Sequence, residues 1–144
     1  MNQTKPRFRR PTADEQQVLS AMEVRLVRPS EVTKCYELIV LEHYLKSARL
    51  VGEHLRYVVV WKGRWLALAT WSAAAFHLKA RDQFIGWTEA QRRERLPLLV
   101  NNARLLVLPE CHYPNLISRF MKAMLARLAA DWLAAWGHPV ALAE

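Results

Sequence analysis

Apolar residues follow two different periods along this chain, and the change of period is clearest in its last third. Residues Ala103–Leu108 form a short run of Leu and Val with one Arg, closed by Pro109. Such a run predicts a buried strand, because Pro interrupts regular structure. From Asn115 to Trp132 the apolar positions recur every three or four residues. That period predicts a long helix with one face in the core.

The end of this predicted helix carries a stop signal. Gly137 tolerates the left-handed conformation that closes many helices, and Pro139 cannot continue one. The apolar run 139–143 then predicts a further strand. The order strand, loop, long helix, strand is typical of a crossover unit in an α/β or α+β sheet.

The first thirty residues predict a short helix followed by a strand. Thr12 and Glu15 form a capping-box pattern, which starts a helix over residues 13–21. The alternating pattern in "MEVRLVRP" predicts a strand that ends at Pro29.

The next part of the chain predicts a helical region and then a hairpin. Ser30 is a suitable N-cap for a helix over residues 31–41, and "HYLKSARLVG" extends the helical character to Gly52. The two β-rich runs "LRYVVVW" and "RWLALATWSAAAF" are separated only by Lys62 and Gly63. A two-residue spacer that contains Gly predicts a β-hairpin.

The remaining middle segment turns polar. "HLKARDQFIGW" is interpreted as a loop, and Thr88 with Gln91 forms a second capping box that opens a short basic helix ended by Pro97. Together these elements predict an α+β fold, with a mixed sheet and flanking helices. The predicted organisation is a basic arm with a short helix over residues 1–22, followed by a single mixed-sheet domain over 23–144.

Composition supports one folded domain. The chain has 144 residues, 52% of them hydrophobic, and six Trp, which excludes disorder of the whole chain. Its weakly charged stretch 120–136 is interrupted by Lys122, Arg127 and Asp131, so no membrane span is predicted. The polar, basic N-terminus has no apolar signal core, so we expect a cytoplasmic location and no membrane partner.

The charge balance makes a polyanion an expected partner. Lys and Arg number 21 against 13 Asp and Glu, which gives a net charge of +8. Such a surplus favours nucleic acid or the phosphates of coenzyme A, since each neutralised phosphate releases counterions. A basic surface that serves only solubility is the third interpretation.

Five segments of the chain form a recognisable series: "EHYLKSARLVGEHLRYVV", "RDQFIGW", "LLVNNARLLVLPE", "NLISRFM" and "DWLAAWGHPVALAE". In this order and with similar gaps, they resemble the family that includes DruA of the Druantia anti-phage systems and relatives found beside transposases. The resemblance implies a DNA-associated role in antiviral defence or a mobile element, with DNA as a partner and other defence-system or transposase proteins as further partners.

The chain departs from this family's pattern in two places. Glu42 and His43 stand where the family tends to have a His pair, and Lys46 stands where it tends to have Gly. Family members also continue beyond the segment that matches "ALAE", into a Thr-Phe-Val-Asp sequence and a further block rich in Gly, Tyr, Asn and Trp. The sequence is therefore interpreted as C-terminally incomplete, and a truncated, non-catalytic remnant is one of the hypotheses.

The element order is also similar to the first two thirds of the GNAT-type N-acyltransferase fold. That resemblance implies an alternative function, acyl transfer from acyl-coenzyme A, with the cofactor held by a strand end and a helix N-terminus. The residues it points to are Leu106, Val107, Leu108, Leu116, Ile117 and Ser118. The loop "ECHYPNLIS" has no Gly, however, which favours a shared architecture without the cofactor, so the first hypothesis expects none.

Three groups of residues are candidates for contact with nucleic acid or for chemistry. Arg81 and Asp82 fit a phosphate contact and a proton acceptor, or else residues that tie their loop to backbone amides. Asn101, Asn102 and Arg104 fit recognition of a phosphodiester or a base edge, or else a turn before a strand. Asp82 and the two Asn residues, Asn101 and Asn102, are the candidates for a catalytic role.

The third group is the densest positive cluster, and it consists of Lys79, Arg81, Arg92, Arg93 and Arg95. On a helix Arg92 and Arg95 share a face, which suits a row of phosphate contacts as well as a solvated surface. The two Cys and five His show no metal-ligand spacing, so no metal site is predicted. Cys35 and Cys111 are expected to be reduced, buried or half-buried thiols.

Overall fold

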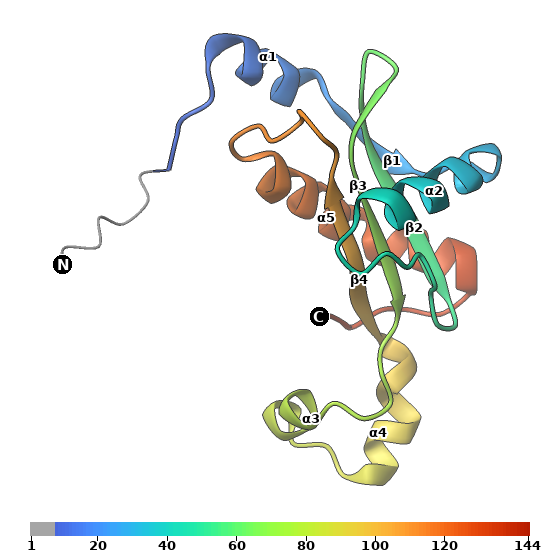
Figure 1. The fold of residues 1–144 in the computed structure, drawn as a ribbon. Coiled ribbons are helices and arrows are strands. Elements are labelled where there is room, and N and C mark those ends of the chain that lie inside the picture. Colours follow the sequence, from blue (N-terminus) through green and yellow to red (C-terminus); the bar gives the residue numbers. More distant parts are fainter. Residues whose placement is uncertain (1–7) are drawn as a thin grey trace.

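The protein is built on a mixed β-sheet with helices on both faces, in a computed structural model that describes residues 8–144 (Figure 1). Within these residues the sheet has five strands in the order β1-β2-β3-β4-β5. The first four strands pair antiparallel, whereas β4 and β5 are parallel. This arrangement confirms the predicted α+β fold. The strands are β1 (Glu23–Leu26), β2 (His54–Trp61), β3 (Arg64–Ala73), β4 (Leu99–Val107) and β5 (Leu142–Ala143).

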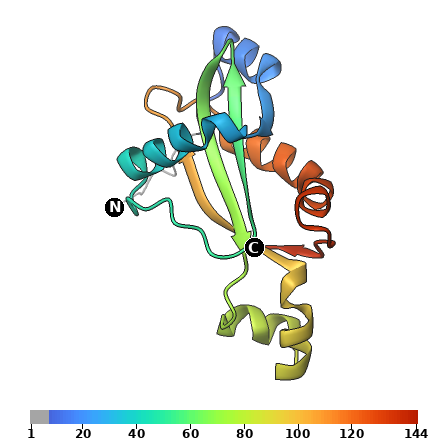
Figure 2. The same ribbon diagram turned by 90° about the vertical axis from the view of Figure 1, so that its right-hand side faces the viewer.

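One long helix covers one face of the sheet and a shorter helix covers the other (Figures 1 and 2). Tyr57 and Trp71 reach the long helix, α5, where they donate hydrogen bonds to Asp131 and to the sulfur of Met124. The helices within residues 8–144 are α1 (Ala13–Ala21), α2 (Val32–Glu42), α3 (Lys79–Ile85), α4 (Glu89–Arg95) and α5 (Leu116–Trp136), with 3-10 turns at Pro29–Glu31 and Leu96–Leu98.

The β2–β3 hairpin follows directly from its two turn residues. Lys62 and Gly63 both have positive φ, at 49° and 75°. This is the backbone of a type I′ turn, whose twist matches that of the paired strands. The predicted hairpin is therefore confirmed.

The buried stripe of α5 supplies much of the core. Its fully or almost fully buried residues, at intervals of four, are Leu116, Phe120, Met124, Leu128 and Trp132. Burying a large apolar side chain stabilises a fold by about 1.5–3 kcal/mol, so this one face outweighs the helix's intrinsic propensity. The helix ends at Gly137, whose φ of 77° is left-handed. Both the predicted helix and its stop signal are confirmed.

The helical prediction for residues 43–52 is wrong. The helix α2 ends at Glu42, and His43 already has an extended backbone. The following segment crosses the sheet as coil, and the carbonyl of Ser47 accepts a hydrogen bond of 2.7 Å from Arg104 of β4. A tertiary contact thus takes a backbone group that a helix would have used. The predicted N-cap is also one residue early, since Ser30 lies inside the 3-10 turn before α2.

The loop prediction for "HLKARDQFIGW" is wrong as well, because α3 occupies most of it. The helix is short and exposed, so it lacks the apolar period that reveals longer helices. It ends at Gly86, which has a left-handed φ of 76°. The strand predicted over 103–108 begins earlier, at Leu99, and the predicted strand 139–143 pairs only at Leu142–Ala143.

Residues 1–7, which include most of the expected basic arm, lie outside the described residues. At the start of the described part, Arg9 forms an exposed ion pair with Glu15. Thr12 and Glu15 form the predicted capping box of α1. From residue 8 onward, no helix has both the length and the apolar character that crossing a bilayer requires.

Candidate nucleic-acid interface

Residues 74–98 form a helical protrusion that leaves the sheet after β3 and returns to it at β4. It contains α3 and α4 and stands off one end of the sheet (Figures 1 and 2). Five of the six predicted nucleic-acid contacts fall on its two helices: Lys79 and Arg81 on α3, and Arg92, Arg93 and Arg95 on α4. The side chain of Arg81, however, is turned inward and is only 5% exposed.

Arg81 fastens the protrusion to the rest of the molecule. Its side chain is only 5% exposed, and it pairs with Asp82 at 3.1 Å and with Glu144 at 3.0 Å. It also donates a 2.8 Å hydrogen bond to the carbonyl of Ala75. Every part of the guanidinium is therefore engaged within the protein, so Arg81 acts as a clamp between α3, the end of β3 and the segment after α5.

Asp82 continues this network on the other side. One carboxylate oxygen accepts from Arg81 and the other accepts from Arg92, each at 3.1 Å. Burial alone raises the pKa of Asp82, but the hydrogen bonds from Arg92 and Arg81 outweigh it and leave the pKa below its ordinary value. The group thus stays ionised with both oxygens occupied, which suits a structural anion better than a proton acceptor.

Arg92 joins the two helices of the protrusion. Its guanidinium carbon lies 4.8 Å from the ring centroid of Phe76, and its side chain is only 14% exposed. A cavity of about 420 Å³ lies beside it, and the lining residues include Lys79, Asp82 and Trp87. Trp87 itself is half-buried, which agrees with an ordered segment rather than a free loop.

The outer surface of the protrusion combines free cations with an exposed aromatic ring. Lys79 and Arg95 are exposed and have no ion-pair partner within residues 8–144. Arg93 has only an exposed partner, Glu89, with side chains 67% and 65% accessible. Phe84 of α3 is 90% exposed. The sequence had signalled the cations by their density, but Phe84 was missed, although an aromatic residue among cations is a recognisable signal.

Arg104 lies apart from the protrusion, in the middle of β4. It donates to the carbonyls of Ser47 and Ala103, both at 2.7 Å, and so fastens the coil after α2 to the sheet. The side-chain amide of Asn102 donates to the carbonyls of Thr70 and Arg104, where the β3–β4 register shifts. The segment "NNAR" therefore contains a β-bulge, and the side chains of Asn102 and Arg104 stabilise the backbone around it. Asn101 is half-buried on the same strand.

The residues implied by the acyltransferase resemblance gather at the other end of β4. Leu106, Val107 and Ile117 line a cavity of about 540 Å³, together with His43 and Tyr44 from the end of α2. Leu108 and Leu116 are buried beside it, whereas Ser118 is exposed in the first turn of α5. The strand β5 pairs with β4 only at Leu99 and Val100, so it leaves this end of β4 uncovered.

The cysteine and histidine residues do not form a reactive centre. Cys35 and Cys111 are fully buried free thiols, as expected, and burial raises the pKa of Cys35 to about 11 and that of Cys111 above its usual value. Such thiols are poor nucleophiles. Across residues 8–144, no three His, Cys, Asp or Glu side chains converge in a way that suits a metal ion.

Comparison with known proteins gives one match. The family model described as DruA, Druantia protein DruA, matches residues 1–143. No curated protein and no solved structure matches the chain.

Proposed function

Because the chain belongs to the DruA family and is thus a Druantia anti-phage protein, we propose that it works by binding DNA through the helical protrusion. The observation that carries this proposal is the surface of 74–98, where the two helices α3 and α4 carry both exposed cations without strong internal partners and a 90% exposed Phe84. Other defence-system or transposase proteins are the further partners of this proposal. It assigns the protein no catalytic step.

The chemistry of the protrusion suits a single strand or an opened duplex. Lys79, Arg93 and Arg95 are placed to neutralise phosphates, and each contact of this kind releases counterions. Phe84 offers a ring on which an unpaired base can stack, an interaction worth about 1–3 kcal/mol. Arg81 and Arg92 act as positioning residues, because their guanidinium groups hold the protrusion together.

The test is DNA binding followed by fluorescence anisotropy at several salt concentrations. Wild-type affinity for single-stranded DNA should fall linearly with salt on logarithmic axes, with a slope near −0.7 for each phosphate contact. The triple variant K79A/R93A/R95A should reduce the magnitude of this slope by about 2. Phe84→Ala should weaken binding by about tenfold or more and leave the salt slope unchanged, because stacking involves no ion release.

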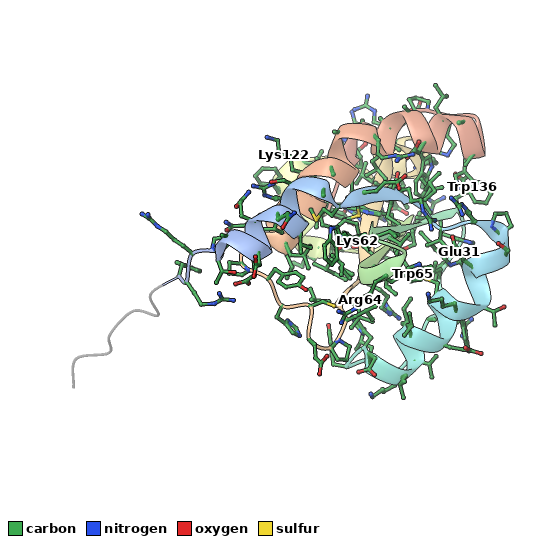
Figure 3. The ribbon with its side chains drawn as sticks, turned by 90° about the horizontal axis from the view of Figure 1, so that it is seen from above. Glu31, Lys62, Arg64, Trp65, Lys122 and Trp136 are labelled. Atoms are coloured by element: carbon green, nitrogen blue, oxygen red, sulfur yellow. The ribbon has the colours of Figure 1, made fainter. Side chains whose placement is uncertain are left out.

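The matched control removes two cations at the opposite end of the sheet. Lys62 and Arg64 lie at the β2–β3 turn, which Figure 3 shows from above. The ten residues of β3 separate this turn from the protrusion by roughly 30 Å. K62A/R64A should therefore bind almost as well as wild type. Binding that is absent, insensitive to salt, or lost in the control rather than in the protrusion variant would contradict the proposal.

The second candidate function is N-acyl transfer from acyl-coenzyme A, and the cavity of about 540 Å³ at the end of β4 is the observation in its favour. In the antiparallel ladder, the N–H of Leu108 bonds the carbonyl of Leu66, so Leu105 and Val107 direct their backbone groups away from β3. Such groups suit the amides of a pantetheine arm. The N-cap Asn115 makes no side-chain cap, which leaves amides in the first turn of α5 available for a phosphate.

Calorimetry with acetyl-coenzyme A tests this second candidate. Saturable heat that disappears when the cavity is narrowed by Val107→Trp would support it, since Val107 is half-buried at the cavity wall. The absence of heat at millimolar ligand would count against it. The triple variant of the protrusion serves as the control and should bind the cofactor like wild type.

A further inference from the structure

A second cavity, of about 330 Å³, lies where the protrusion rejoins the sheet. Its walls come from the loop before β2, the end of β3, the region of α4, and the end of α5, which meet at this end of the molecule (Figure 2). The polar and aromatic part of its wall, together with one small residue, comprises Glu53, Ala74, Phe76, Arg93, Trp132 and His138. Leu96, Pro97 and Leu99 make the rest of the wall largely apolar. Its size falls within the range of small-ligand sites.

The cavity contains one carboxylate that is held in a fixed orientation. Glu53 accepts a 3.2 Å hydrogen bond from the indole N–H of Trp132, and the same oxygen, Oε2, lies 2.5 Å from Nε2 of His138. The other ring nitrogen of His138 lies 2.9 Å from the carbonyl of Pro139. Both ring nitrogens face acceptors, which favours the doubly protonated ring, and the hydrogen bonds with Pro139 and Glu53 raise the pKa of His138 above its ordinary value.

This arrangement leaves one strong acceptor free. Within residues 8–144, Oε1 of Glu53 has no hydrogen-bond partner, and the side chain is 39% exposed. His138 and Trp132 both occupy Oε2, so Oε1 is the acceptor that remains for a ligand. A ligand that donates a hydrogen bond from a flat, weakly polar body is therefore complementary to it.

The opposite side of the cavity supplies a ring and a cation. Phe76 is 41% exposed in the wall, and the guanidinium of Arg92 holds it in place. Arg93 also lines the cavity, and its exposed pair with Glu89 contributes little free energy, so another anion readily replaces it. An acceptor, an aromatic surface and a cation thus surround one small space.

We propose that this cavity binds one nucleobase that carries an exocyclic amino group, with the amino group donating to Oε1 of Glu53 and the adjoining phosphate paired with Arg93. The inference rests on the proposed function, since the protrusion would bring a DNA strand to the cavity. An ionised carboxylate only accepts hydrogen bonds. Thymine has no amino group, and carbonyl oxygens flank its single N–H, so Glu53 disfavours it against cytosine, adenine or guanine.

The test compares an all-thymine oligonucleotide with one that has a single central cytosine. The wild-type protein should bind the cytosine-containing strand about tenfold more tightly, the discrimination expected of a specific base contact. Glu53→Gln should bring the two affinities within twofold. Ala74 is half-buried in the cavity wall, so Ala74→Leu should narrow the cavity while keeping both Glu53 and His138, and it should abolish the same preference. Glu94→Gln removes an exposed carboxylate of α4 and should change nothing.

A second arm uses cytidine and thymidine monophosphates, with the indole N–H resonance of Trp132 as the readout. A shift that saturates with cytidine monophosphate, and is lost in Ala74→Leu, shows that the cavity takes the base itself. If cytidine monophosphate gives this shift but no oligonucleotide binds, the ligand is a free nucleotide. In that case the proposed DNA-binding function is refuted, whereas the base pocket is supported. Salt-dependent DNA binding with equal affinity for both strands and no shift overturns the base pocket and leaves the proposed function standing.

Discussion

Replacing Arg81 with Met should release the helical protrusion from the sheet. The substitution keeps an unbranched side chain of similar length but removes the guanidinium, which leaves the carboxylate of Glu144 and the carbonyl of Ala75 without their donor. Asp82 keeps its second partner, Arg92. The damage is therefore concentrated at the junction between α3, the end of β3 and the segment after α5.

The size of the effect follows from burial. Removing one partner from a buried ion pair costs about 3–5 kcal/mol, because the other charge stays desolvated and unpaired. Arg81 is 5% exposed but Glu144 is 20% exposed and can regain some water, which places the cost near the lower limit, at about 3 kcal/mol. If the free energy of local opening of α3 falls by this amount, its amide hydrogens should exchange about 100-fold faster.

Native-state hydrogen exchange by mass spectrometry measures this directly, and urea unfolding reports the global stability. Arg93→Met is the matched control, since its ion pair is exposed on both sides and such pairs contribute less than about 1 kcal/mol. Exchange in β2 and β3 should be much less affected than exchange in α3. If the two variants exchange at the same rate in α3, within threefold, Arg81 is not the clamp described above.

Three other substitutions test separate parts of the fold. Hydrogen bonds from Arg25 and from the backbone of Arg28 lower the pKa of Glu31 to about 2, from an ordinary 4.5, so its contribution is complete above 4.5 and is lost as the pH falls toward 2. The difference in unfolding free energy between wild type and Glu31→Gln should therefore shrink across that interval in urea titrations. Thr70→Val should raise the unfolding free energy by about 1 kcal/mol, because the buried hydroxyl of Thr70 has no hydrogen-bond partner within residues 8–144. Gly137→Ala should lower the melting temperature, at a cost of about 1 kcal/mol, since the left-handed φ of 77° is strained for Ala although its Cβ meets no atom.

The elements that the sequence predicted well are those whose signal is local. The hairpin depends on two turn residues, Lys62 and Gly63, and α5 depends on a stripe that repeats over five turns. In α3 the helix is held by a distant contact, from Arg81 to a residue 63 positions away, and its own sequence has no apolar period. The helix predicted over residues 43–52 is absent for the opposite reason. Its sequence has a helical pattern, but Arg104 binds the backbone carbonyl of Ser47, which a helix would need for its own hydrogen bonds.

The candidate site likewise has features with a local sequence signal and features that depend on distant contacts. Sequence density grouped the cations of α3 and α4 into one cluster, but it gave Arg81 and Lys79 the same role. Burial distinguishes the two residues. The guanidinium of Arg81 is enclosed in ion pairs, whereas the ammonium of Lys79 is exposed at the surface. The contact between Glu53 and His138 joins positions 85 residues apart and has no spacing signal at all. Such clusters become visible only when the strands and α5 bring their ends together.

The two candidate functions occupy opposite ends of β4, and this limits how they can be combined. The protrusion adjoins Leu99, and the cavity suited to a pantetheine arm adjoins Val107. These residues are separated by roughly 26 Å along an extended strand. Arg104, between them, already donates to Ser47 and Ala103, so it adds no free cation to guide DNA along the strand. A nucleic acid held at the protrusion would have to extend roughly 26 Å along β4 to reach that cavity, so DNA binding at α3 and α4 and cofactor binding at the other end of β4 are separable, and a variant of one site should leave the other intact.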